Sequence, residues 1–307
     1  MKKLILIDGN AILHRAYHAL PPLTSKNGEI VNAVYGFFSM FLKILEDQKP
    51  DFLVVCFDRA APTFRQELFI GYQAHRPKMA DDLFPQVGFV HEILEKAKIC
   101  IFEVDGYEAD DLIGTIANQA KSIETVIVSG DRDLLQLVNS HVKMLAPITG
   151  LTNMLIYDSK KVLEKFGIEP SQVVDYKALV GDASDNYPGV AGIGPKTAGN
   201  LLSEYNSLEN IYKNLEAIRK KNEKLGIRLA EGAESAGLAK KLARIVTNAP
   251  IALDVEKCAV LNMNREGLKS EFERFGFKSL LKRLTGASRK ETRDTKREGN
   301  TKQMELL

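Results

Sequence analysis

The chain has 307 residues, 45% of them hydrophobic, which is enough for one large folded domain or for two of ordinary size. Its formal net charge of +2 excludes a protein that is acidic or basic throughout, so its acidic motifs stand out against a chain rich in Lys and Arg. The apolar run near Met1 stops at Asp8. It is too short for a signal peptide or a membrane span, and it predicts a cytoplasmic protein without a membrane partner.

Four short apolar runs in the first half of the chain are predicted strands, namely residues 3–7, 52–57, 99–104 and 125–128. They are rich in β-branched residues and almost wholly apolar, as strands buried on both faces are. Helical patterns separate them, and the Phe residues of 30–45 recur at helical spacing, as core residues do. The alternation predicts an α/β domain with a mainly parallel sheet. Two further runs are expected to be edge strands, residues 142–145 and 155–157.

Carboxylates follow these predicted strands. The densest group, around Asp110, opens a helix, whose free N–H groups favour negative charge. Ligands of parallel sheets bind beyond the carboxyl ends of the strands, so the acids are expected to converge on one site. The acids are Asp8, Asp58, Glu108, Asp110, Asp111, Asp131 and Asp133.

A cluster of this size predicts bound cations. Two carboxylates about 5 Å apart repel by roughly 3 kcal/mol at an effective dielectric constant near 20. Hard oxygen ligands favour Mg²⁺ or Mn²⁺, and no Cys or His lies nearby at zinc spacing. A large carboxylate cluster is typical of two ions that bridge one phosphate, which indicates phosphodiester hydrolysis by metal-activated water.

The three cysteines are far apart in the sequence, each in apolar surroundings. We predict that Cys56, Cys100 and Cys258 are buried free thiols in a reducing compartment.

The helix expected after Asp8 carries His14 and His18, four residues apart. A shared metal is a weaker interpretation than two ordinary surface residues, because no third ligand is evident. Arg15 on the same helix is either a phosphate contact or a solvated side chain.

The segment from residue 62 to 78 mixes cations with aromatic rings. This pattern suits single-stranded nucleic acid, because cations follow the phosphates and rings stack on bases. An amphipathic surface helix is the alternative, and the position directly after an acidic strand end favours the nucleic-acid interpretation. The residues concerned are Phe64, Arg65, Phe69, Tyr72, Arg76 and Lys78.

From about Gly167 the pattern becomes wholly helical, so a domain boundary is expected there. The glycine-rich residues 188–198 contain G-x-x-x-x-G, but Pro195 separates Gly194 from Lys196, so a P-loop is not favoured. A helix–hairpin–helix fits better, with Gly192 and Gly194 in the turn and Pro195 at the first helical position.

The N–H groups of such a hairpin can hold a DNA phosphate, and Lys196 would add a charge-assisted contact. Asp182 and Asp185 lie just before it, three apart, so on a helical turn they would share a face and return to the acidic site. The basic residues of 211–228 fit a solvated helix face or a DNA contact.

Few apolar residues occur after Gly286, which predicts a disordered basic tail over residues 285–307. The last five residues, Gln303–Leu307, resemble the pentapeptide by which bacterial replication proteins bind the sliding clamp. The alternative is a terminus without a role.

With these motifs in view, residues 1–284 resemble the 5′-nuclease family, which includes the 5′→3′ exonuclease domain of bacterial DNA polymerase I, phage 5′ nucleases and flap endonucleases. The motifs are I-D-G-N at 7–10, F-D at 57–58, F-R-x-E-L at 64–68, G-Y-x-A-H-R at 71–76, G-Y-E-A-D-D at 106–111, S-G-D-R-D at 129–133, G-D-x-S-D-N at 181–186 and P-G-V-x-G-I-G-P-K-T-A at 188–198.

The resemblance implies a PIN-like catalytic domain over residues 1–167 with a helical arch near 62–85. It implies an all-helical helix–hairpin–helix (helix-three-turn-helix) DNA-binding domain over 168–284. It also implies a stand-alone, monomeric nuclease that cleaves DNA at 5′ flaps, nicks and RNA-primed ends.

The same resemblance implies the site residues. The first metal site would comprise Asp8, Asp58, Glu108 and Asp110, and the second Asp131, Asp133 and Asp185, with Asp111 and Asp182 assisting. Arg65 and Arg76 would act at the scissile phosphate. The DNA contacts would be Arg15, Arg65, Tyr72, Gln73, Arg76, Lys78, Gly192, Gly194, Lys196 and Thr197, and the hairpin would hold a monovalent cation such as K⁺.

One position departs from the family pattern. The arch motif usually reads G-Y-K-A-x-R, and Gln73 stands where the Lys helps to neutralise the phosphate. Two functions therefore remain, an active metal-dependent nuclease and a DNA-junction binding module with little catalysis. The intact carboxylate set favours the nuclease.

Overall fold

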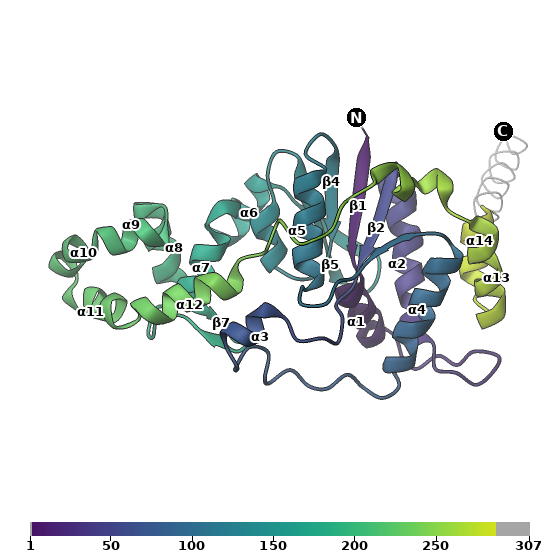
Figure 1. The fold of residues 1–307 in the computed structure, drawn as a ribbon, viewed down its shortest axis with the longest axis horizontal. Helices are drawn as coiled ribbons and strands as arrows, with labels where there is room; N and C mark the ends of the chain where they lie inside the picture. The colour runs from purple at the N-terminus through teal and green to yellow at the C-terminus, as the bar shows by residue number, and fades with distance from the viewer. Residues whose placement is uncertain (1, 287–307) are drawn as a thin grey trace, which may run out of the picture.

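The structure of the chain is a computed structural model that describes residues 2–286. A sheet lies in the middle of an elongated molecule (Figure 1). A helical lobe, residues 173–243, lies at one end, and the helices α13 (Arg265–Phe275) and α14 (Lys278–Thr285) lie at the other. The strands are β1 (Lys3–Asp8), β2 (Phe52–Cys56), β3 (Cys100–Phe102), β4 (Glu124–Val128), β5 (Val142–Thr149), β6 (Asn153–Tyr157), β7 (Gly181–Asp182) and β8 (Tyr187–Pro188).

The helices alternate with the strands only in the first part of the chain. They are α1 (Gly9–Ala19), α2 (Asn32–Gln48), α3 (Phe64–Leu68), α4 (Phe84–Lys96), α5 (Ala109–Gln119), α6 (Ser159–Phe166), α7 (Val173–Val180), α8 (Pro195–Tyr205), α9 (Leu208–Lys213), α10 (Leu215–Lys221), α11 (Glu223–Glu231), α12 (Ala233–Ala243), α13 (Arg265–Phe275) and α14 (Lys278–Thr285). Short 3₁₀ helices lie at η1 (Asp133–Leu137), η2 (Pro170–Gln172), η3 (Val255–Cys258) and η4 (Val260–Asn262).

The main sheet has six strands in the order β3-β2-β1-β4-β5-β6, and all neighbours pair in parallel except β5 and β6. The predicted mainly parallel sheet is therefore confirmed. The chain moves outward from β1 to β3 and then returns to β4 on the other side of β1. This reversal leaves a crevice at the carboxyl ends of β1 and β4, which is where ligands of open α/β sheets bind.

Alternate residues of each central strand join different core layers, as the two-residue period of a strand requires. Leu4 and Leu6 pack with α5 on one face, whereas Ile5 and Ile7 pack with α1, α2 and α4 on the other. The Phe residues of α2 are fully buried, so their predicted place in the core is confirmed.

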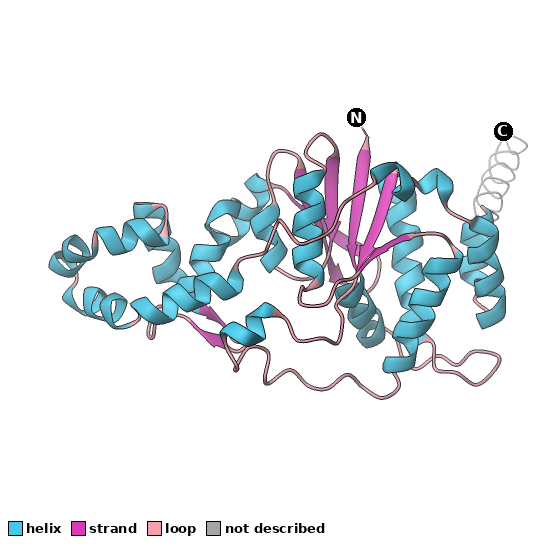
Figure 2. Cartoon of the chain, viewed as in Figure 1, coloured by secondary structure: helices cyan, strands magenta, loops and turns pink. Residues whose placement is uncertain are grey.

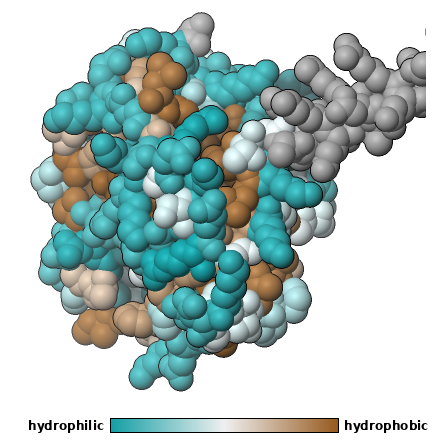
Figure 3. Space-filling view, turned by 90° about the vertical axis from the view of Figure 1, so that its right-hand side faces the viewer, coloured by the Kyte–Doolittle hydropathy of each residue, from teal (hydrophilic) through white to brown (hydrophobic). Residues whose placement is uncertain are grey.

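The final helices return to the sheet. Phe272 and Phe275 of α13 and Leu280 of α14 join the core layer of α2 and α4. The expected helical domain of residues 168–284 is therefore too long, because these apolar side chains complete the sheet's own core. Viewed from this end, the surface is mostly hydrophilic with separate apolar patches (Figure 3).

The expected helical arch near 62–85 is largely not helical. Only α3 and the first turn of α4 are helical there, and turns and an extended loop connect them (Figure 2). Gln73 has a positive φ of 56°, and Pro77 lacks the N–H that a helix interior needs, so both interrupt a continuous helix.

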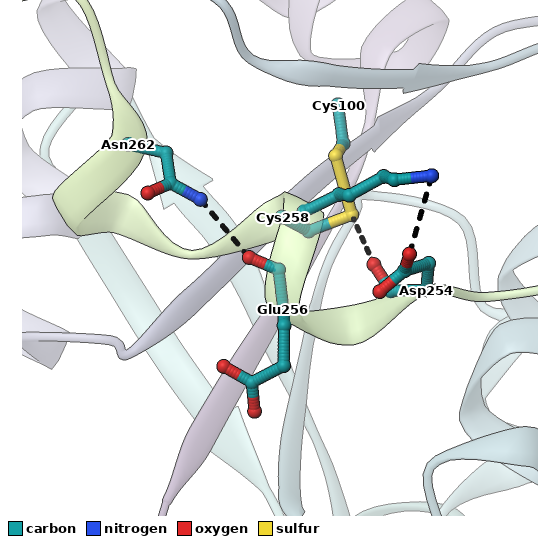
Figure 4. The surroundings of a disulfide bond; sticks show 6 residues. Cys100, Asp254, Glu256, Cys258 and Asn262 are labelled. Carbon is teal, nitrogen blue, oxygen red and sulfur yellow. Dashed lines mark hydrogen bonds and ion pairs between the residues drawn. A yellow bond between two sulfur atoms is a disulfide. The ribbon is translucent and has the colours of Figure 1, made fainter.

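The prediction of three free thiols is wrong for two of them. Cys100 of β3 and Cys258 of η3 form a disulfide with a Cα–Cα distance of 5.3 Å (Figure 4). The segment after α12 brings them together, because it returns along the sheet edge and Val260 N donates to Asp51 O. Cys56 is a free, buried cysteine.

None of the helices within residues 2–286 is long and apolar enough to cross a membrane. Thr285, which was expected to begin the disordered tail, is the last residue of α14, and Gly286 is its C-cap. The rest of the proposed tail and its Gln303–Leu307 motif lie outside the described residues.

Candidate active site

The first carboxylate stands at the central strand. Asp8 is 5% exposed and caps α1, since its Oδ1 accepts from Ala11 N at 2.9 Å. Its Oδ2 accepts from Ser129 Oγ at 2.6 Å, which ties the end of β1 to the segment after β4. The switch in strand order thus places Asp8 and the loop of Asp131 side by side.

The N-terminus of α5 holds the next group. Asp58 Oδ1 accepts from Ala109 N at 2.7 Å, so a free helix N–H fixes this carboxylate. Glu108 is the N-cap of α5 and accepts from Thr63 Oγ1 at 3.2 Å and from Tyr72 OH at 3.1 Å. Asp110 lies in the first turn of the same helix.

Seven carboxylates line one cleft of about 450 Å³, so the predicted convergence of the strand-end acids holds for most of them. His14, Arg65, Gln73 and Arg76 line the same cleft. The seven are Asp8, Asp58, Glu108, Asp110, Asp131, Asp133 and Asp185.

The crowding perturbs their protonation. Burial raises the pKa of Asp8 to about 7, even though hydrogen bonds from Ser129 and Ala11 act in the opposite direction. Burial likewise raises the pKa of Glu108 to about 7. The pKa of Asp110 lies well above its ordinary value because of burial and the neighbouring Asp131 and Asp8. Burial and the neighbouring carboxylates thus favour protonation of these groups in the protein alone.

A second cluster lies where the helical lobe meets the sheet. Oxygens of Asp133, Asp182 and Asp185 lie within 4.8 Å of one another. Asp133 Oδ1 is buried and is in contact with the ammonium of Lys177. Carboxylate oxygens at this spacing fit a hard divalent cation, which binds its ligands at about 2.0–2.6 Å. Asp182 reaches this cluster from β7 and not from the helical turn that the sequence predicted.

The base of the arch is bound to Asp185. Gln73 Nε2 donates to Asp185 Oδ1 at 3.1 Å, and Arg76 Nη2 donates to the same oxygen at 2.8 Å. Tyr72 OH approaches Oδ2 at 3.4 Å, and Asn186 Nδ2 donates to Gly71 O at 2.6 Å. The segment is thus held across the cleft between the catalytic domain and the helical lobe.

Two predicted site residues serve the architecture. Arg65 and Asp111 form a buried bidentate pair at 2.7 and 2.8 Å, with side chains 3% and 0% exposed. Arg65 also donates to Leu242 O, and Asp111 accepts from Val246 N at 2.8 Å. Arg65 Nη1 also lies 3.2 Å from Glu108 Oε2 in the cleft. These partners engage the guanidinium and the carboxylate within the protein, and the DNA contact of Arg65 and the metal contact of Asp111 stay predictions.

Tyr72 was expected to contact DNA, but it is only 4% exposed and stacks on Tyr187 with ring centroids 6.4 Å apart. Its ring is therefore not available to a base, and its hydroxyl instead orients Glu108 and Asp185.

The remaining predicted DNA contacts differ in whether their side chains are free to reach DNA. Arg15 donates to Ile148 O and Gly150 O of the β5–β6 hairpin at 3.0 and 3.2 Å, which directs it away from the cleft. Lys78 is exposed on the arch loop. In the hairpin of the lobe, Gly194 is the N-cap of α8, Pro195 begins that helix, and Gly192 has a positive φ of 75°. Lys196 is exposed there and Thr197 is partly buried.

The rings of His14 and His18 lie 6.5 Å apart and stack, and the described residues offer no third ligand beside them. The sequence analysis missed Lys177, whose ammonium contacts both Asp133 and Asp182. Its signal was a single cation in a largely apolar helical run, five residues before Asp182.

Two family models match the chain. The model of the 5′-3′ exonuclease N-terminal resolvase-like domain matches residues 3–167, and that of the 5′-3′ exonuclease C-terminal SAM fold matches residues 168–266. The chain belongs to the 5′-3′ exonuclease family. The predicted resemblance and the predicted enzyme class, a nuclease, are thereby confirmed.

Curated relatives match most of this chain, but the chain covers very different shares of their own lengths. The 5′-3′ exonuclease of Aquifex aeolicus is 38% identical over 92% of this chain and 96% of its own length. DNA polymerase I of Caldicellulosiruptor bescii is 44% identical over 92% of this chain, and that of Bacillus subtilis is 40% identical over 92%. The chain spans only about a third of each polymerase, 33% and 32%.

Solved structures share the fold of this chain. The T5 5′-exonuclease with bound zinc has a TM-score of 0.67 at 19% identity, covering 92% of this chain and all of that one. The catalytic core of Rad2 in complex with DNA substrate has a TM-score of 0.59 at 18% identity, covering 92% of each chain. At these identities the likeness establishes the fold alone.

Proposed function

We propose that this exonuclease hydrolyses phosphodiester bonds at 5′ flaps, nicks and RNA-primed 5′ ends of DNA, in the cytoplasm, as a monomer, during replication and repair. The observation that carries the proposal is the convergence of seven carboxylates in one cleft at the carboxyl edge of the sheet. Membership of the 5′-3′ exonuclease family supports the direction of attack.

The carboxylates would hold two divalent ions, Mg²⁺ or Mn²⁺. Asp8, Asp58, Glu108 and Asp110 would hold one, and Asp133, Asp182 and Asp185 the other, with Asp131 between the two groups. When bound, such ions supply an activated water and stabilise the attacking and leaving oxygens. The raised pKa values of Asp8 and Glu108 support this assignment, because nearby cations would allow these groups to ionise.

The chain's own residues would position the DNA. Arg76 is half exposed at the cleft and can approach a phosphate while it still borders Asp185. Lys78 follows it on the exposed arch loop. In the lobe, the N-terminus of α8 and Lys196 offer N–H groups and a charge to a duplex phosphate, and the adjacent turn would hold K⁺.

The alternative is a junction-binding module with little catalysis, which the neutral Gln73 would favour. A labelled 5′-flap duplex, incubated with the protein in Mg²⁺ or in EDTA, separates the two. The nuclease predicts cleavage that EDTA abolishes, whereas the module predicts binding without cleavage in both. The clamp contact of Gln303–Leu307 stays a separate proposal about the tail.

A further inference from the structure

Lys177 is the cation nearest the second carboxylate cluster, and its position is unusual. It lies in the last turn of α7, and its side chain is only 16% exposed. Its ammonium contacts Asp133 of η1 and Asp182 of β7. These carboxylates belong to the catalytic domain and to the helical lobe, so one buried charge joins the two.

The positive charge of Lys177 lies among three carboxylates. Asp133 Oδ1 is buried, and the ammonium of Lys177 is its ion-pair partner. Asp182 is held further by Ser184 N, which donates to its Oδ1 at 2.7 Å. Asp185 completes the cluster within 4.8 Å and is already paired with Arg76.

We infer that Lys177 is an internal cation that occupies the second metal site when no ion is bound, and that the incoming divalent ion displaces it. The inference rests on the proposed function, because it takes Asp133, Asp182 and Asp185 as ligands. An ammonium and a divalent ion compete for the same oxygens, so binding of the second ion would exchange one charge for another. The ammonium would also keep the two domains aligned before the ion arrives.

The structure offers the displaced side chain a place. A cavity of about 480 Å³ opens from the cluster. It is lined by Asp133 and Asp182 of the cluster, by Lys177 itself, and by Arg132, Tyr176 and Ser184. The ammonium could swing into this solvent-accessible space without unfolding α7.

The test is a calorimetric titration of the metal-free protein with Mn²⁺, without DNA. Removal of the competing charge in Lys177→Met should tighten the dissociation constant of the second ion by about tenfold or more, since a unit charge a few ångströms away acts strongly on a divalent ion. Lys177→Arg keeps the charge and should remain within about threefold of wild type. Lys177→Gln is a second neutral variant, and it should tighten binding if Lys177→Met does not fold.

Lys240→Met is the matched control. Lys240 also bridges two carboxylates, Asp175 and Glu209 at 2.6 Å each, with a side chain 15% exposed, but it lies outside the cluster. It should lower thermal stability without changing the affinity for Mn²⁺. The metal-free melting temperature of Lys177→Met should also fall, and Mn²⁺ should restore it more than it raises that of wild type.

Two results separate the role of Lys177 from the existence of the second metal site. If Lys177→Met and Lys177→Gln bind the second ion as weakly as wild type or more weakly, the inference is overturned while the metal site stands. Asp133→Asn tests the site itself, because it should lose one bound ion. If it binds as many ions as wild type, the proposed second site fails whatever Lys177 does.

Discussion

At the scale of single residues, neutral donors orient several of the carboxylates. Ser129 donates to Asp8, Thr63 to Glu108 and Gln73 to Asp185. A neutral donor fixes the direction of a carboxylate without cancelling its charge, which leaves the negative charge of Asp8 available to cations. Glu108 and Asp185 are in addition partly neutralised by Arg65 and Arg76.

Gln73→Lys should increase the rate of flap cleavage. The Gln73 amide already reaches Asp185, so an ammonium at this position would lie beside the carboxylates and the reacting phosphate. One well-placed electrostatic donor can be worth about 10²–10³ in rate. Single-turnover cleavage measures the effect, and a rate equal to or below that of wild type would show that Arg76 already supplies the needed charge.

Arg65→Ala should lower the free energy of unfolding by about 3–5 kcal/mol, because it leaves Asp111 as an unpaired buried charge. Arg59→Ala is the control, since Arg59 pairs with Asp105 at 3.2 Å on the surface, where such pairs contribute about 0–1 kcal/mol. Urea denaturation measures both. Equal losses in the two variants would contradict the structural role of Arg65.

At the scale of elements, the strand ends set the electrostatics of the metal-free site. The pKa of Asp8 is about 7 in the folded protein against an ordinary value of 3.8, and that of Glu108 is about 7 against 4.5. The folded state therefore holds protons that the unfolded state releases between about pH 4 and pH 7.

The free energy of unfolding of the metal-free protein should therefore fall as the pH rises. In EDTA, the stabilising contribution of Asp8 is complete below its unfolded pKa and is lost as the pH rises through about 7. Each extra proton held by the folded state corresponds to about 1.4 kcal/mol per pH unit. Urea denaturation at pH 5 and pH 7 should show this loss, and Asp8→Asn should reduce it. The same slope in wild type and Asp8→Asn would refute the assignment.

The sequence predicted the elements that have a local signal. The apolar runs that became β1, β2 and β4, and the acids that end them, were evident because strands buried on both faces have few polar residues. The arch carried no comparable signal. Its cations and rings suggested nucleic acid, but whether Arg65 faces DNA or Asp111 depends on Leu242 and Val246, which lie far away in the sequence.

At the scale of the whole molecule, the return of the chain from the lobe was not predictable. The sequence showed that α13 would be helical, but not that Phe272 would pack on Phe38, with ring centroids 5.5 Å apart. The same return brings Cys258 to Cys100 across 158 residues, a distance that no local pattern reports.

Counting reactive thiols tests the disulfide directly. In the denatured, unreduced protein, an alkylating reagent should modify one thiol, that of Cys56. After reduction it should modify three. Cys258→Ser should lower the free energy of unfolding by about 2–5 kcal/mol, because the bond closes a long loop in the unfolded chain. Its stability should then not change on adding reductant. Three reactive thiols before reduction would contradict the bond.

The most direct test of the account compares Asp131→Asn with wild type on one labelled 5′-flap duplex in Mg²⁺, measuring binding by anisotropy and cleavage by single turnover. Asp131 lies in the carboxylate cleft and contributes charge, not a DNA contact. We predict that the variant binds the flap about as tightly as wild type but cleaves it at least about 10²-fold more slowly. Cleavage by Asp131→Asn at the wild-type rate would contradict the proposal that this carboxylate cluster performs the hydrolysis.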